Sequence, residues 1–386
     1  MHGLHVGIVT ETYPPEVNGV ANTVSRYVQG LSERGHRVSL VRPRQHARDL
    51  GQGALLVPGL PLPGYQGLRM GLPAAACLRA HWQAQRPDVL YIATEGLLGR
   101  SAMQVAGEMN IPVMSGFHTN FHTYSRHYRI GFLKGAIYAY LRKLHNRGAC
   151  TVVPTQQLCA ELKGHGFANV QVSPRGVDCT LFTPARRDEG LRRKWGAGER
   201  ERVVLYVGRL AAEKNLPLAI ETFRAMQRHD PHLRLVMVGD GPLHRRLAAE
   251  HRDIMFTGTQ RGETLAACYA SADIFLFPSE SETYGNVTLE AMASALAVVA
   301  FDYAAASNLI SHGRNGLLAP LGEHAGFIET ACELVSGQRD VETLRSQARK
   351  RALSQSWERV LDQFEALLLQ CHTNQGGVRC PAEQCC

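Results

Sequence analysis

The chain has 386 residues, of which 45% are hydrophobic and 20% charged, an ordinary composition for a globular protein, and its length predicts two domains. The 42 Lys and Arg against 34 Asp and Glu give a formal charge of +8, which favours anionic ligands such as nucleotide diphosphates or acidic lipids. No nucleic-acid motif accompanies this charge, and no apolar run approaches the roughly 20 residues that span a bilayer, so neither a nucleic-acid partner nor a membrane-spanning helix is expected.

The N-terminal half predicts a Rossmann-like alternation of strands and helices. Residues 4–10 and 37–41 have the pattern of strands that flank an amphipathic helix, with Asn18-Gly19-Val20 at the turn into that helix. The usual G-x-G-x-x-G of dinucleotide-binding proteins is missing. No basic, cleavable leader precedes the first strand, so a cytoplasmic protein is expected. Further strands are predicted at 89–93, 112–116, 151–154 and 170–173.

Polar residues follow two of these strands, at the edge where open α/β sheets bind ligands. Thr94-Glu95-Gly96 follows one strand, and His118 follows the next. His122 and His127 lie nearby, but no carboxylate is interleaved with the histidines, so a zinc site is not expected here.

The second half repeats the pattern after a charged, Gly-containing linker near 184–201. We expect a first domain over 1–184, a second over 185–356, a last helix over 357–370 and a disordered tail over 371–386. The tail is rich in cysteine, and the alternatives for it are a zinc site with His372 or a lipidated Cys-Cys end. Strands of this half are predicted at 203–208, 235–238, 274–277 and 298–301.

The segment from Ser279 to Phe301 carries the most informative functional pattern. A polar turn with a glycine follows an apolar run, and a helical pattern begins near Asn286, which predicts a strand, loop and helix of a parallel sheet. Glu282 lies in the predicted loop, and Glu290 lies one turn inside the helix. The free N–H groups of the helix start favour a diphosphate between the two carboxylates, which is the layout of a nucleotide sugar. An acidic loop followed by a solvated Glu is the alternative interpretation.

This segment closely resembles the donor-site motif of family 4 retaining glycosyltransferases: Glu282, seven residues and Glu290, with Gly285-Asn286-Val287 between them. The Pro-Pro and Asn-Gly-Val loop near the N-terminus and the Gly-Arg-Leu and Glu-Lys-Asn stretch over 208–215 are also similar to this family, and the resemblance covers residues 7 to 368. It implies the α/β GT-B fold, in which two Rossmann-like domains with parallel sheets face each other across a cleft. The second domain would hold the donor and the first the acceptor.

The resemblance also implies a role for each matching residue. Gly19 would face the donor diphosphate, while Arg209 and Lys214 would clamp it. The catalytic pair would be His118, which holds the transferred sugar near its reacting carbon, and Glu282, which orients the sugar hydroxyls. The remaining donor-binding residues would be a glycine near the base, the helix start and a ribose-binding carboxylate: Gly239, Gly285, Asn286, Val287 and Glu290.

The implied reaction transfers a hexose with retention of its anomeric configuration, and the departing phosphate accepts the proton of the acceptor hydroxyl. The sequence contains no Asp-x-Asp pair, with which metal-dependent transferases hold a cation on the diphosphate. We therefore expect no metal and no other cofactor, and cationic side chains would stabilise the leaving group instead.

The motifs look closest to bacterial GDP-mannose-dependent α-mannosyltransferases, so GDP-mannose is the favoured donor. UDP-sugar enzymes that make glycolipids look nearly as close. A nucleotide-sugar epimerase, which needs no acceptor, and a sensor that binds without turnover are further hypotheses.

The acceptor is expected to be a hydroxyl of a lipid or glycan. An apolar loop over 57–65 and a basic, tyrosine-rich segment over 125–147 favour a lipid, with peripheral contact at the anionic inner face of a membrane. A packed loop and a helix with a solvated basic face are the alternatives.

Overall fold

The computed structural model describes residues 3–16, 18–46, 48–61, 69–118, 134–198, 201–282 and 284–373. The chain forms two compact units, one made of Met1–Pro174 with Val360–Cys386 and the other of Arg175–Arg359. The chain enters the second unit at Arg175, before the boundary that we expected after residue 184. It does so because Val177 forms a parallel bridge to Ser356, and Gly176 packs directly against Trp357.

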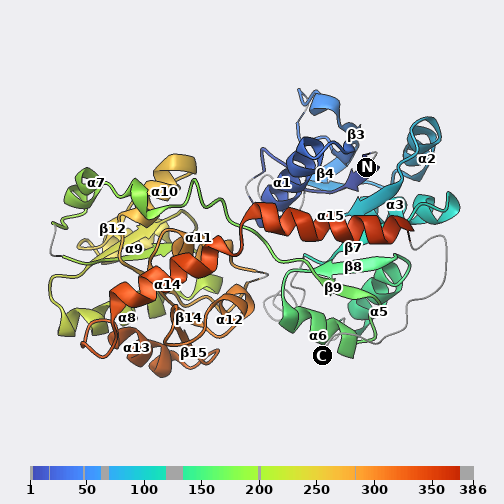
Figure 1. Cartoon of the computed structure of the whole chain (residues 1–386). Helices are drawn as coiled ribbons and strands as arrows, with labels where there is room; N and C mark the ends of the chain where they lie inside the picture. The colour runs from blue at the N-terminus through green and yellow to red at the C-terminus, as the bar shows by residue number, and fades with distance from the viewer. Residues whose placement is uncertain are drawn as a thin grey trace. The chain divides into compact units, whose positions relative to one another are not determined.

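The first unit is built on a parallel sheet, drawn in blue to green in Figure 1, with the strand order β3-β2-β1-β6-β7-β8-β9. Its strands are β1 (His5–Val9), β2 (Arg37–Pro43), β3 (Leu55–Val57), β6 (Val89–Ile92), β7 (Val113–Gly116), β8 (Cys150–Val153) and β9 (Val170–Val172), beside a short hairpin of β4 (Gly59–Pro61) and β5 (Arg69–Gly71). Its helices are α1 (Gly19–Glu33), α2 (Ala75–Ala84), α3 (Leu97–Glu108), α5 (Lys134–His145), α6 (Gln156–Gly164) and most of α15 (Trp357–Thr373).

The central strands of this sheet are buried along their whole length, as the continuous apolar run of β1 predicts for a strand covered on both faces. Helix α1 begins after Asn18, whose side-chain Oδ1 accepts hydrogen bonds from the N–H groups of Val20 and Ala21 at 3.1 and 2.8 Å. This side chain satisfies donors that a helix start otherwise leaves open.

Helix α15 completes the core of the first unit, although it comes from the end of the chain (Figure 1). The ring of Phe364 stacks on that of Tyr27 in α1 at a centroid distance of 3.7 Å, and it meets the edge of Tyr91 in β6 at 4.9 Å. Gly30 of α1 leaves room for the side chain of Leu361, because a Cβ there would lie 2.3 Å from it.

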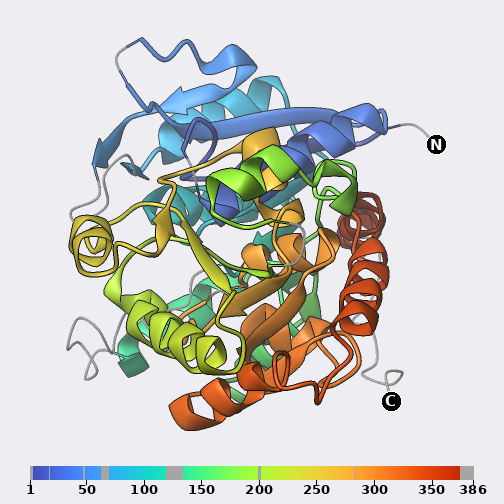
Figure 2. The same cartoon turned by 90° about the vertical axis from the view of Figure 1, so that its left-hand side faces the viewer.

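The second unit is also a parallel sheet, with the order β12-β11-β10-β13-β14-β15. Figure 2 shows its strands, yellow to orange, with helices of the same unit on both sides. The strands are β10 (Val203–Val207), β11 (Arg234–Val238), β12 (Met255–Phe256), β13 (Ile274–Phe277), β14 (Ala297–Phe301) and β15 (Leu317–Ala319). The helices are α7 (Glu189–Lys194), α8 (Leu216–His229), α9 (His244–Glu250), α10 (Gly262–Ala270), α11 (Asn286–Ala293), α12 (Ala304–Leu309), α13 (His324–Cys332) and α14 (Val341–Leu353).

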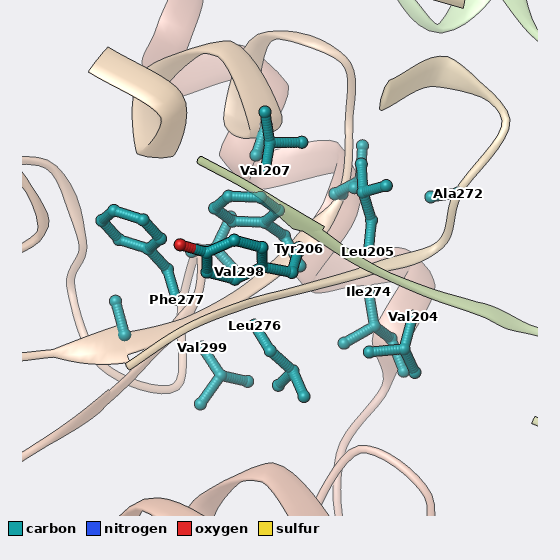
Figure 3. Close-up of a cluster of buried hydrophobic side chains, with 14 of the residues drawn as sticks. Val204, Leu205, Tyr206, Val207, Ala272, Ile274, Leu276, Phe277, Val298 and Val299 are labelled. Atoms are coloured by element: carbon teal, nitrogen blue, oxygen red, sulfur yellow. The ribbon is translucent and has the colours of Figure 1, made fainter. Parts of the chain in front are cut away.

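Strands β10, β13 and β14 form the centre of this second core, with side chains on both faces of the sheet (Figure 3). Tyr206 of β10 is fully buried beside Phe277 of β13, with ring centroids 6.3 Å apart. Both strands therefore end in a rigid, apolar base for the loops that follow them. Among the described residues, no helix is both long and apolar enough to cross a membrane.

Candidate active site

The strand order of the second sheet reverses between β10 and β13. From β10 the chain builds outward through β11 to β12, and from β13 it builds the other way through β14 to β15. Ligands of open α/β sheets bind outside the carboxyl ends of the strands at such a switch point. The loops that leave β10 and β13 carry four of the predicted site residues: Arg209, Lys214, Glu282 and Gly285.

The structure brings Lys214 and Glu282 together at this switch point. The ammonium group of Lys214, in the 3-10 turn Ala212–Lys214, pairs with the carboxylate of Glu282 and donates to the carbonyl of Ser281 at 3.1 Å. The hydroxyl of Ser279 donates to Oε1 of Glu282 at 2.8 Å. Both side chains of the ion pair keep 16% of their surface exposed, so the carboxylate is fixed in position but still reachable by a ligand.

Helix α11 begins at the end of the loop that carries Glu282, and its first backbone N–H groups are open donors. Gly285 before it has φ 91°, a left-handed conformation that favours glycine. Within the described part of the chain, no side chain caps this helix, and Oδ1 of Asn286 is buried without a hydrogen-bond partner. The first N–H groups, including those of Asn286 and Val287, and the positive end of the helix dipole suit an anion.

Glu290 lies one turn into α11 and has an unusual environment. The hydroxyl of Tyr269 in α10 donates to its Oε2 at 2.9 Å. Burial raises the pKa of Glu290 to about 7, and the Tyr269 hydrogen bond opposes that rise. Sequence reasoning found Glu290 but missed Tyr269 and Ser279, and no motif distinguishes these two from other tyrosines and serines.

Arg209 and Gly239 occupy neighbouring loops with different local roles. The side chain of Arg209 is 54% exposed and lies 3.6 Å from a carboxylate oxygen of Glu213, so it is held loosely. Gly239, after β11, packs against the loop after β10, because a Cβ there would lie 1.9 Å from the carbonyl oxygen of Gly208. The structure thus gives Gly239 a packing role, whereas its contact with a nucleotide stays a prediction.

The first sheet has its own switch point, between β1 and β6. Gly19 is the first residue of α1, beside the capping residue Asn18, so this helix start has fewer open donors than that of α11. Glu11 follows β1 and was not predicted as a site residue. Its Oε1 accepts from the N–H of Leu98 in α3 at 3.2 Å, and burial raises its pKa to about 7.

His118 follows β7 in the first unit and is buried, with 7% of its surface exposed. Its Nε2 lies 2.6 Å from the hydroxyl of Tyr91, a residue that sequence reasoning missed. Residues 62–68, 119–133 and Thr283 lie outside the described residues, and with them residues 62–65 of the apolar loop and residues 125–133 of the basic segment that were expected to face a membrane.

Two family models match the chain, one on each unit. The model "Glycosyltransferase Family 4" matches residues 17–181, and "Glycosyl transferases group 1" matches residues 201–337. A GDP-mannose-dependent alpha-mannosyltransferase of Mycobacterium tuberculosis is 33% identical over 371 residues, which cover 94% of this chain and 96% of that protein. The chain belongs to glycosyltransferase family 4. It is a hexosyltransferase, as the sequence motifs predicted.

Further proteins are similar to the chain at lower sequence identity. An alpha-monoglucosyldiacylglycerol synthase of Streptococcus pneumoniae is 27% identical, with 83% of this chain and 76% of that protein covered. Among solved structures, Anabaena Alr3699/HepE in complex with UDP aligns with a TM-score of 0.77 at 18% identity, over 95% of this chain and 100% of that chain. A sucrose-phosphate synthase of Thermosynechococcus elongatus aligns with a TM-score of 0.74 at 17% identity, over 96% of this chain and 99% of that chain. These structures confirm the predicted GT-B type of fold, with two Rossmann-like domains.

Proposed function

We propose that this family 4 enzyme transfers a mannosyl group from GDP-mannose to a hydroxyl acceptor, with retention of configuration and without a metal. The observation that carries the proposal is the switch point of the second sheet, where Lys214, Glu282 and the open start of α11 meet. The choice of GDP and mannose is supported by the relative that is 33% identical and named a GDP-mannose-dependent alpha-mannosyltransferase.

The start of α11 would hold the diphosphate and stabilise the negative charge that develops on it as it leaves. Lys214 fits this role, since an ammonium has three donors and, within the described part of the chain, two of them serve Glu282 and the Ser281 carbonyl. Its third donor would bind a phosphate oxygen, and the exposed Arg209 would add a second cation.

The remaining contacts orient the donor. Glu282 would accept hydrogen bonds from the sugar hydroxyls, Glu290 from the ribose, and His118 would contact the sugar near its reacting carbon. In the reaction, the bond between that carbon and the phosphate oxygen breaks, and a bond to the acceptor oxygen forms on the same face. The leaving phosphate takes the acceptor's proton, so the chain need not supply a nucleophile.

Calorimetric titration of the full chain with GDP, UDP and ADP, in the presence of EDTA, tests the donor site. We expect GDP to bind most tightly without metal and Arg209→Ala to weaken it about tenfold, the value of one charge-assisted contact of roughly 1.5 kcal/mol. Arg252→Ala, which removes another exposed arginine of the same unit, serves as the control. Tighter binding of UDP would transfer the assignment to the UDP-sugar alternative, and binding only after addition of a divalent cation would contradict the metal-free site.

We also propose a lipid-borne acceptor, reached at an anionic membrane surface. The name of the alpha-monoglucosyldiacylglycerol synthase relative supports a lipid. In the first unit, the loop after β2 supports membrane contact, since Leu50 is 93% exposed and the exposed side chains of Arg44 and Arg48 precede it. The buried, bidentate pair of Arg42 and Asp49, at 2.6 and 2.8 Å, holds this loop in place.

Sedimentation with phosphatidylglycerol vesicles, against phosphatidylcholine vesicles, tests this contact. We expect binding to the anionic vesicles alone and its reduction about fivefold or more in Leu50→Asp, which removes apolar burial and adds repulsion. Leu353→Asp is a matched control, because Leu353 is also exposed, at 49%, but lies in the second unit. If both variants lost vesicle binding equally, or if Leu50→Asp lost none, the loop after β2 would not be the membrane contact.

A further inference from the structure

The ring of His118 is attached to a second buried side chain, that of Tyr91. The hydroxyl of Tyr91 lies 2.6 Å from Nε2 of His118, a short hydrogen bond. Tyr91 lies in β6 and is fully buried, and His118 follows the neighbouring strand β7. The hydrogen bond therefore joins the ends of two adjacent strands of the first sheet.

Gly116, at the end of β7, makes this contact sterically feasible. A Cβ at residue 116 would lie 2.5 Å from the hydroxyl oxygen of Tyr91 and 2.6 Å from Nε2 of His118. Any larger residue would occupy the place where the two polar groups meet. Glycine is needed at residue 116 for the space it leaves and not for its backbone freedom, because Gly116 has the backbone conformation of an ordinary strand residue.

The Tyr91 ring is itself held by aromatic side chains from two other elements. Phe364 of α15 approaches it edge-on at 4.9 Å and 89°, and Tyr27 of α1 does so at 5.8 Å and 79°. These two rings stack on each other at 3.7 Å. These ring contacts fix the position of the Tyr91 hydroxyl, and its hydrogen bond to Nε2 in turn fixes the position of the His118 imidazole.

We propose that Tyr91 is a positioning residue for His118, which it holds as a neutral imidazole protonated on Nδ1. A phenol is the better donor and an unprotonated imidazole nitrogen the better acceptor, so the Tyr91 hydroxyl donates to Nε2. The single ring proton of neutral His118 then lies on Nδ1. This inference rests on the proposed function, in which His118 contacts the transferred sugar.

A neutral imidazole in one tautomer suits that contact. Positive charge develops at the reacting carbon as the bond to the phosphate breaks, and an imidazolium beside it would raise the energy of that state. Tyr91 would act through His118, without touching the substrate.

The tautomer is measured by 15N NMR of the full chain labelled at histidine. The His118 signals are assigned by their loss in His118→Gln. We expect an unprotonated Nε2 and a protonated Nδ1 in the unmodified chain, and a shift toward the other tautomer in Tyr91→Phe. Tyr27→Phe is the control, because it removes another hydroxyl from the same aromatic cluster, one that lies 3.5 Å from the hydroxyl of Ser173. A protonated Nε2 in the unmodified chain, or no change in Tyr91→Phe, would overturn the proposal.

Release of GDP from GDP-mannose, with water as the acceptor, gives a second readout. We expect Tyr91→Phe to lower kcat by ~10- to 100-fold, the usual effect of a misplaced catalytic contact, with the KM for GDP-mannose changed by less than about threefold. Tyr27→Phe should keep kcat. The positioning role would be overturned if Tyr91→Phe raised only the KM, or if Tyr91→Phe and Tyr27→Phe lowered kcat equally. If the unmodified chain released no GDP, the proposed function would fail, and the NMR result would still decide the tautomer.

Discussion

Glu282 shows how the chain fixes a single carboxylate. Its loop is irregular, yet Ser279 and Lys214, which follow different strands, both bind Oε1 and so help to fix the position of the group. In the proposed role, this carboxylate would need no rearrangement to bind a sugar hydroxyl, and preorganised contacts of this kind act mainly in the transition state.

Glu282→Gln tests that role directly. The amide keeps the size of the side chain and an acceptor for Ser279 but removes the charge, so we expect kcat/KM for GDP-mannose to fall by ~30- to 1000-fold, or about 2 to 4 kcal/mol. The circular dichroism spectrum should be unchanged. Glu33→Gln, at an exposed residue near the end of α1, should retain full activity. Unimpaired turnover in Glu282→Gln would contradict the assignment.

Glu290 predicts a dependence of stability on pH. Its folded pKa, about 7, lies above the ordinary value of 4.5, so between these values the unfolded chain ionises the group while the folded chain keeps it protonated. The free energy of unfolding should therefore fall as pH rises from about 4.5 to 7, by up to roughly 3 kcal/mol from this residue, and level off above 7. Below 4.5 the residue contributes no pH dependence.

Urea unfolding at pH 5 and pH 8 measures this effect. The unmodified chain should lose more stability over this interval than Glu290→Gln, which has no ionisable group at that position. Glu11 has a similar environment and should add a second, independent part of the decrease. Identical pH dependence in the unmodified chain and in Glu290→Gln would show that the carboxyl group titrates normally.

At the scale of elements, α15 combines two kinds of contact with α1. Phe364 is fully buried in the aromatic cluster, whereas Arg34, the residue that follows α1, pairs with Asp362 at 2.7 Å and with Glu365 at 2.6 Å near the surface. Burial of an aromatic ring is worth several times an exposed ion pair.

Phe364→Ala should therefore destabilise the first unit by about 3 to 5 kcal/mol, because it removes a ring from a packed core. Asp362→Ala, in the same helix, should cost less than about 1 kcal/mol, since that carboxylate is 63% exposed. Thermal and urea unfolding of the two variants would compare them. Equal costs would contradict this prediction, because they would mean that the ion pair of Asp362 contributes as much to the attachment of this helix as the ring of Phe364.

At the scale of the whole molecule, most of the predicted ligand contacts in the second unit lie in two segments, residues 208–215 after β10 and residues 279–290 after β13, whereas Gly239 follows β11. Saturating GDP with EDTA should slow hydrogen exchange in residues 208–215 and 279–290, because ligand contacts suppress local opening of these loops. Mass spectrometry of peptides would locate the effect, with UDP as the comparison. Protection confined to the first unit would contradict the donor site.

The sequence predicted features that lie within one continuous segment, and it missed contacts between residues that are far apart in the chain. The strand, loop and helix that carry Glu282 and Glu290 form one continuous segment, so their pattern predicted this part of the fold correctly and gave the candidate site, which stays a prediction. Tyr269 is 21 residues from Glu290 and Tyr91 is 27 from His118, and no spacing rule connects residues of separate elements. Likewise, the step into the second unit at Arg175 depends on Ser356 and Trp357, nearly at the other end of the chain.

The division of the chain has a consequence for the order of folding during synthesis. The second unit is one continuous segment, Arg175–Arg359, and has all its strands once residue 359 has left the ribosome. The first unit, although begun earlier, lacks Phe364 until α15 has been synthesised, so Tyr27 and Tyr91 cannot complete their cluster before then. The second unit can therefore complete its sheet before the first unit completes its core, whose apolar surface stays open until α15 is made.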